Sequence, residues 1–224
     1  QGLYKTNLEY DLWYDVGGKD AIHGYVYTDM LSDYLYIKPA NVFFSENAMY
    51  KSTELEPSEY GRELIEELGR GVLDKYRLRK AESDHKFVVF LPGTNCIQEL
   101  LDFDKTKRAV DQGAVVKPHP LSSVSLLVYL KNAFGEDNVL GKKESGHELM
   151  RGADIVGCCA NSEMGIAAIA ARKGFHLFSD IKSRKHSTYT SIYKAVLSGG
   201  DYRENLTKLF SSPFSGIVHG KSDD

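Results

Sequence analysis

The sequence predicts an α/β protein with a doubly wound, Rossmann-like parallel sheet. From Lys86 onward, short apolar segments alternate with segments of helical periodicity. The apolar segments end abruptly at glycine, proline or polar residues, as buried parallel strands do. This alternation is typical of βαβ units. We therefore expect a Rossmann-like domain at 86–224, preceded by an N-terminal part at 1–56 and a connecting helix at 57–85.

The expected elements follow in chain order from the pattern of apolar residues. Leucine and isoleucine recur at helical spacing after Pro57, which predicts one long helix over 57–79, although Gly69 and Gly71 weaken it. We expect strands at 87–91, 114–117, 138–140, 154–159 and 175–178. We expect helices at 96–110, 146–152, 162–172, 188–197 and 202–210, and one capped by Ser122 or Ser123 that ends near Gly135.

The N-terminal part has its own composition. It holds eight of the 14 tyrosines and the single tryptophan, Trp13. A strand is expected at 40–44, and no clear period precedes it. This part is too short and irregular to equal the second one, so we expect a remnant of a truncated first domain or a reduced one.

Length and composition narrow the class of protein. The 224 residues with a net charge of −3 allow one large domain, or one domain plus part of another. No apolar run is long enough for a membrane span. Of the three cysteines, Cys158 and Cys159 are adjacent on a predicted buried strand, which argues against a disulfide framework and favours a cytoplasmic protein. No histidine or cysteine spacing resembles a zinc site. The slightly acidic net charge does not favour nucleic acid as a partner, and a homodimer is one possible assembly.

The most informative segment is the end of the strand at 114–117, where an apolar run stops at Lys117-Pro118-His119-Pro120. The prolines cannot continue the strand, so Lys117 and His119 are expected at the carboxyl end of a central strand. Ligands of open α/β sheets bind at that edge, and two basic groups there predict an anionic ligand such as phosphate. The alternative is a solvated lysine and a structural histidine.

Two further loops are predicted at the same edge. Asn161, Ser162 and Glu163 open an alanine-rich helix, whose first N–H groups can bind phosphate, or Asn161 or Ser162 is only the N-cap. Gly93, Thr94 and Asn95 follow the strand at 87–91 and offer close approach and hydrogen bonds, or form a plain turn.

Two more candidates lie elsewhere in the chain. His23, which precedes Gly24, is a candidate general base exposed on a tight turn, with a structural histidine as the alternative. Arg184 and Lys185 lie in the basic loop at 182–188, which either contributes cations to a diphosphate or is simply solvated.

Together these segments resemble the GT-B glycosyltransferases that build capsular polysaccharide, polysialic acid and teichoic-acid polymers. The resemblance covers roughly 22–178 and is specific only at 117–120 and 153–174. It implies two Rossmann-like domains, of which the C-terminal one binds the diphosphate of a nucleotide-sugar donor, and a glycan as the acceptor. His119 and Lys117 would contact the diphosphate, the segment 161–163 would hold phosphate, and His23 would deprotonate the acceptor hydroxyl.

The resemblance implies no metal cofactor if protein cations stabilise the leaving diphosphate. One departure concerns ribose recognition, because relatives carry an acid within the alanine-rich helix and the acid here, Glu163, comes earlier. Two alternatives remain: a non-catalytic nucleotide- or phosphate-binding domain, and a transferase that glycosylates modified DNA bases.

Overall fold

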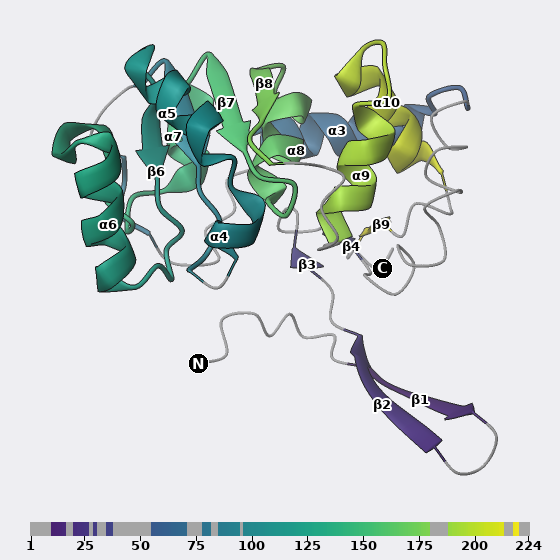
Figure 1. Cartoon of the computed structure of the whole chain (residues 1–224). Helices are drawn as coiled ribbons and strands as arrows, with labels where there is room; N and C mark the ends of the chain where they lie inside the picture. Colours follow the sequence, from purple (N-terminus) through teal and green to yellow (C-terminus); the bar gives the residue numbers. More distant parts are fainter. Residues whose placement is uncertain are drawn as a thin grey trace.

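A four-stranded parallel sheet forms the centre of the structure, a computed structural model (Figure 1). Its strands are β5 (Phe87–Phe90), β6 (Val115–Lys117), β7 (Ile155–Cys158) and β8 (Gly174–Leu177), in the order β6-β5-β7-β8. Each neighbouring pair is parallel, which confirms the α/β class and the predicted sheet. The structure describes residues 10–16, 20–26, 29–30, 35–37, 55–70, 78–81, 85–94, 96–179, 188–212 and 217–219.

The strand order is that of a Rossmann-like sheet. A parallel bridge pairs Val139 with Val116, on the edge of β6 that faces away from β5, and Leu140 N–H donates to Val116 O at 2.9 Å. If β5, β6, the Val139 segment, β7 and β8 are numbered 1 to 5 along the chain, their order across the sheet is 3-2-1-4-5, as in dinucleotide-binding domains. Two predictions need correction. The strand expected at 138–140 is this single bridge after a 3₁₀ turn (Glu136–Asn138), and β6 lies beside it rather than at the centre.

Helices cover both faces of the sheet, as a doubly wound fold requires. Along β5, Val88 and Phe90 belong to one apolar cluster and Val89 to the other, because successive strand residues face opposite sides. On the Val89 side lie α4 (Ile97–Leu100), α5 (Phe103–Asp111) and α6 (Val124–Phe134). On the other side lie α3 (Glu59–Arg70), α7 (Gly146–Gly152), α8 (Glu163–Ala170), α9 (Thr188–Val196) and α10 (Tyr202–Ser211).

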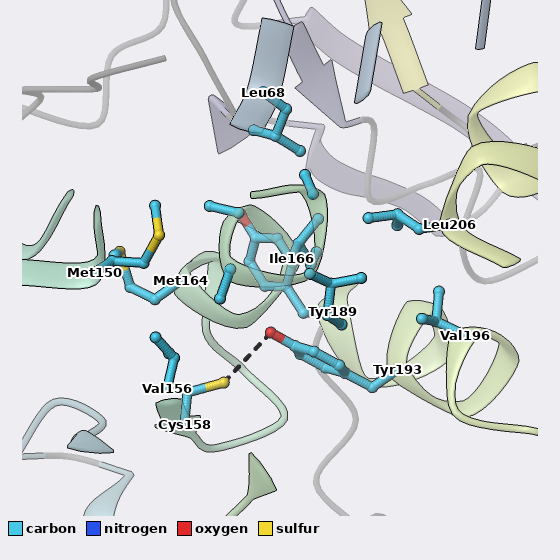
Figure 2. Packing of buried hydrophobic residues seen from close by; sticks show 14 of the residues in the cluster. Leu68, Met150, Val156, Cys158, Met164, Ile166, Tyr189, Tyr193, Val196 and Leu206 are labelled. Carbon is cyan, nitrogen blue, oxygen red and sulfur yellow. Dashed lines mark hydrogen bonds between the residues drawn. The ribbon is translucent and has the colours of Figure 1, made fainter. Parts of the chain in front are cut away.

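Helix α8 is buried from Met164 to Ala170, between the sheet and helices α3, α7, α9 and α10. Figure 2 shows Ile166 of this helix among Leu68 of α3, Tyr193 of α9 and Leu206 of α10. Met164 lies beside Met150 of α7 (Figure 2). Tyr193 stacks on Phe175 with ring centroids 5.6 Å apart, and its hydroxyl lies 3.4 Å from the Cys158 sulfur. Cys158 and Cys159 are buried free thiols, as the sequence predicted.

Two of the predicted helices have different limits. The helix expected at 96–110 is broken into α4 and α5, because Asp102 adopts an extended conformation and its carboxylate caps the N–H of Lys105. The long helix expected at 57–79 ends at Arg70 as α3; residues 71–77 lie outside the described residues. Arg79 instead forms a strand-like bridge with Glu144. The remaining predicted helices agree with the structure to within a few residues.

The N-terminal part contains strands where no period was evident in the sequence. β1 (Tyr10–Val16) and β2 (Asp20–Val26) form an antiparallel hairpin, which Figure 1 shows apart from the four-stranded sheet. β3 (Asp29–Met30) pairs with β4 (Leu35–Ile37), and β4 pairs with β9 (Ile217–His219) near the C-terminus. The strand expected at 40–44 lies outside the described residues.

Within the described residues, no helix has the length and apolar character needed to cross a membrane. The same part of the chain contains no cluster of three or more histidine, cysteine, aspartate or glutamate side chains able to hold a metal ion.

Candidate functional site at the carboxyl edge of the sheet

The carboxyl edge of the sheet brings together three of the predicted loops. Because β5, β6 and β7 are parallel neighbours, the segments that follow them leave the sheet on the same side. The first two are also hydrogen-bonded to each other. Leu91 N–H donates to Lys117 O at 2.9 Å, and Ser123 N–H donates to Thr94 Oγ1 at 2.9 Å. The Gly93-Thr94 turn therefore lies against the turn that contains His119.

Lys117 is buried rather than solvated. The residue is only 2% exposed. Its Nζ donates to Pro118 O at 2.9 Å and to Lys142 O at 3.1 Å. Burial lowers the pKa of this ammonium to about 8, and the nearby Glu144 carboxylate partly opposes that shift. Two carbonyls thus occupy two of the three N–H donors. The predicted contact between Lys117 and a phosphate stays a prediction.

His119 is half-buried and its ring has a defined orientation. The Leu121 N–H donates to His119 Nδ1 at 3.2 Å, and Ser122 N–H donates to His119 O at 2.9 Å. A neutral imidazole whose Nδ1 accepts a hydrogen bond carries its proton on Nε2. The neutral ring therefore carries its N–H on Nε2.

The loop after β7 is held tightly at the start of α8. Ser162 is the N-cap, with Oγ accepting from Met164 N–H at 3.2 Å, and its predicted contact with phosphate, which is compatible with that role, stays a prediction. The Tyr193 hydroxyl donates to Ser162 O, and Ala160 N–H donates to Ser179 Oγ at 2.8 Å. A helix start with one first-turn N–H already capped offers fewer donors to a ligand than the sequence suggested.

Two buried polar atoms on this edge lack a hydrogen-bond partner among the described residues. They are Asn161 Oδ1, in the loop after β7, and Ser122 Oγ, in the turn after β6, where the residue is 1% exposed. Buried polar side chains normally have a protein or water partner, and leaving one unpaired costs roughly 1–3 kcal/mol. Unpaired groups of this kind are typical of places where a ligand or water completes the hydrogen bonding.

The other predicted site residues are distributed differently. Gly93 and Thr94 lie at the edge as expected, and Glu163 is the first residue of α8. Asn95, Arg184 and Lys185 lie outside the described residues. His23 is inside strand β2, paired with Trp13, so its expected position on a tight turn is wrong. The strand could not be predicted from the sequence, because apolar and polar residues alternate only weakly in this hairpin.

Sequence reasoning missed one residue at this site. Lys142 Nζ donates to Ser122 O at 2.6 Å, which connects the loop after the Val139 bridge to the turn that holds His119. No local pattern marks this lysine, since it belongs to a pair of adjacent lysines in a polar loop. Only the pairing of Val139 with Val116 brings that loop beside the turn.

Comparisons of the chain with protein-family models, with curated proteins and with solved structures find no match. The fold and the geometry of the carboxyl edge are therefore the basis for assigning a function.

Proposed function

We propose that this protein is a glycosyltransferase that uses a nucleotide-activated sugar and binds the donor at the carboxyl edge of the sheet. The position of His119 carries the proposal. It lies at the edge where α/β sheets bind ligands, and the hydrogen bond to its Nδ1 orients the ring and puts the proton of the neutral form on Nε2. The unpaired Asn161 Oδ1 and Ser122 Oγ at the same edge add support, because a ligand at this edge would supply their missing partners.

The chemistry of such a transfer fits these groups. The acceptor hydroxyl oxygen forms a bond to the anomeric carbon, and the bond from that carbon to the phosphate oxygen breaks, so the diphosphate leaves with the electron pair. A hydrogen bond from His119 Nε2–H to a phosphate oxygen strengthens as negative charge develops there. A base must take the proton from the acceptor hydroxyl; His23 stays a hypothesis for this role, since nothing described brings β2 to the site.

A thermal-shift screen of the whole chain against UDP, CDP, CMP, GDP and dTDP tests the proposal. A ligand present at one hundred times its Kd raises the free energy of unfolding by about 2.7 kcal/mol, which for a chain of this size is a shift of about 5–10 °C. Calorimetry then gives the affinity, and the matching nucleotide sugar tests turnover. If none of the nucleotides raises the melting temperature, the proposal is wrong.

His119→Ala provides the residue-level test, with His176→Ala as its control. His176 is an exposed histidine on β8, so its replacement should leave nucleotide binding unchanged. Loss of a hydrogen bond to a charged oxygen is worth about 1.5–3 kcal/mol, so His119→Ala, which has no side-chain donor, should weaken binding roughly 10- to 100-fold. Equal affinity in the two variants would remove His119 from the site.

A non-catalytic nucleotide-binding protein is the second candidate. The observation in its favour is that two of the three N–H donors of Lys117, the most basic group of the turn, already bond to carbonyls. Fold does not dictate activity, so the two candidates separate only by turnover. Binding of a nucleotide without transfer or hydrolysis of any matching nucleotide sugar would favour this second function.

A further inference from the structure

The turn that contains His119 is fixed at both ends by lysine side chains. Before His119, Lys117 Nζ donates to Pro118 O at 2.9 Å. After it, Lys142 Nζ donates to Ser122 O at 2.6 Å. The two lysines are also joined, because Lys117 Nζ donates to Lys142 O at 3.1 Å. These three bonds enclose the stretch 119–121, in which the Leu121 N–H meets the imidazole.

The loop that carries Lys142 has its own anchors. Arg79 N–H donates to Lys143 O at 2.8 Å, and Ser145 N–H donates to Arg79 O at 2.8 Å. The Glu144 carboxylate accepts from Gly141 N–H at 2.7 Å, which closes the turn at Lys142. The loop is therefore held from its other side by the segment at 78–81. A support that is itself fixed at several points can define where the His119 turn lies.

We propose that Lys117 and Lys142 are positioning residues that fix the His119 ring in its Nε2–H form for binding of the donor diphosphate. The identity of the ligand in this inference rests on the proposed function, whereas the orientation of the ring does not. Lys117 is buried, so its ammonium is solvated by the two carbonyls rather than by water. Hydrogen bonds from an ammonium to a carbonyl are stronger than those from a neutral donor, so they hold the backbone more firmly. Groups that support a binding residue set its geometry, which loops achieve poorly by themselves.

The test measures the His119 ring directly, by two-dimensional NMR of its imidazole nitrogens in the whole chain. The wild type should show Nδ1 as the unprotonated nitrogen, and His119→Gln identifies the signal. Lys142→Met and Lys117→Met should each shift the ring toward a mixture of the two neutral forms, whereas Lys142→Arg, which keeps a donor for Ser122 O, should restore the wild-type pattern. Lys143→Met is the matched control, since Lys143 is an exposed neighbour on the same loop.

Binding of inorganic pyrophosphate and of UDP, measured by calorimetry, provides the second readout. We expect about tenfold weaker binding in Lys142→Met and no change in Lys143→Met. A His119 spectrum that is the same in Lys142→Met and in the wild type would overturn the positioning role. Because Lys117→Met also changes the packing of a buried position, the half-buried Lys142 is the deciding position.

The two proposals fail in different ways. If the His119 signal moves in Lys142→Met but no nucleotide or pyrophosphate binds the wild type, the positioning role stands and the proposed function is wrong. If nucleotides bind the wild type and Lys142→Met equally and the His119 signal does not move, the proposed function stands and the positioning role is wrong.

Discussion

Lys117 makes the stability of this protein depend on pH in a way that one substitution should remove. Its ammonium is buried, and burial lowers the pKa of the group to about 8 from its ordinary value of 10.5. Between these two pH values the unfolded chain binds a proton at Lys117 that the folded chain has lost. The free energy of unfolding therefore rises with pH across this window.

The size of the effect follows from the two pKa values. From about pH 7 to about pH 10, a lysine with a folded pKa of about 8 and an unfolded value of 10.5 adds about 2.5 kcal/mol to the free energy of unfolding. The Glu144 carboxylate, which raises the pKa, is already included in that value. Other groups titrate in the same range, so the effect appears only as a difference between wild type and variant.

Urea unfolding at several pH values provides the measurement, with the wild type compared with Lys117→Met and Lys143→Met. The stability of the wild type relative to Lys117→Met should grow by about 2.5 kcal/mol between about pH 7 and about pH 10. Lys143→Met, which removes an exposed lysine, should run parallel to the wild type. If the curve of Lys117→Met is parallel to that of the wild type as well, Lys117 is not buried as a charged group and the reasoning fails.

Two more predictions concern the core around α8. Gly165→Ala should lower the free energy of unfolding by about 1–3 kcal/mol in thermal denaturation, because a Cβ there would lie 2.7 Å from the Cys158 sulfur and also meet the Tyr193 hydroxyl; an unchanged melting temperature would contradict this packing. Iodoacetamide should modify half-buried Cys96 in the native protein well before Cys158 and Cys159, since burial raises the pKa of Cys158 to about 12 and that of Cys159 well above its ordinary value. Peptide mapping by mass spectrometry measures the rates, and equal rates at all three thiols would refute it.

The sheet could be predicted from the sequence because each strand is a short apolar run with a sharp end. Val88, Val89 and Phe90 need no partner to be recognised as buried, and Pro118 ends the next run whatever surrounds it. The break between α4 and α5 could not be predicted in this way. Its cause includes a tertiary contact, since Asp102 N–H donates to Phe178 O at 2.8 Å across the edge of the sheet.

Part of the candidate site could be predicted from local sequence and part depends on tertiary contacts. The position of Lys117 and His119 at a strand end follows from local chemistry, and the structure agrees with it. The burial of Lys117 does not, because its partner carbonyl on Lys142 is 25 residues further along the chain. The sequence predicts either a lysine that binds a phosphate or a solvated lysine, and neither interpretation includes an ammonium bonded to two backbone carbonyls.

The strand order also determines what size of ligand the site would suit. His119 follows β6 and Ser162 follows β7, and β5 lies between these two strands. Adjacent strands are about 4.8 Å apart, so the two loops start roughly 10 Å from each other, across the Gly93-Thr94 turn. A nucleoside diphosphate can reach across this distance, whereas a single phosphate cannot. If donor binding uses both loops, UDP or CDP should therefore raise the melting temperature more than inorganic phosphate at the same concentration, and equal shifts would limit the site to one of the loops.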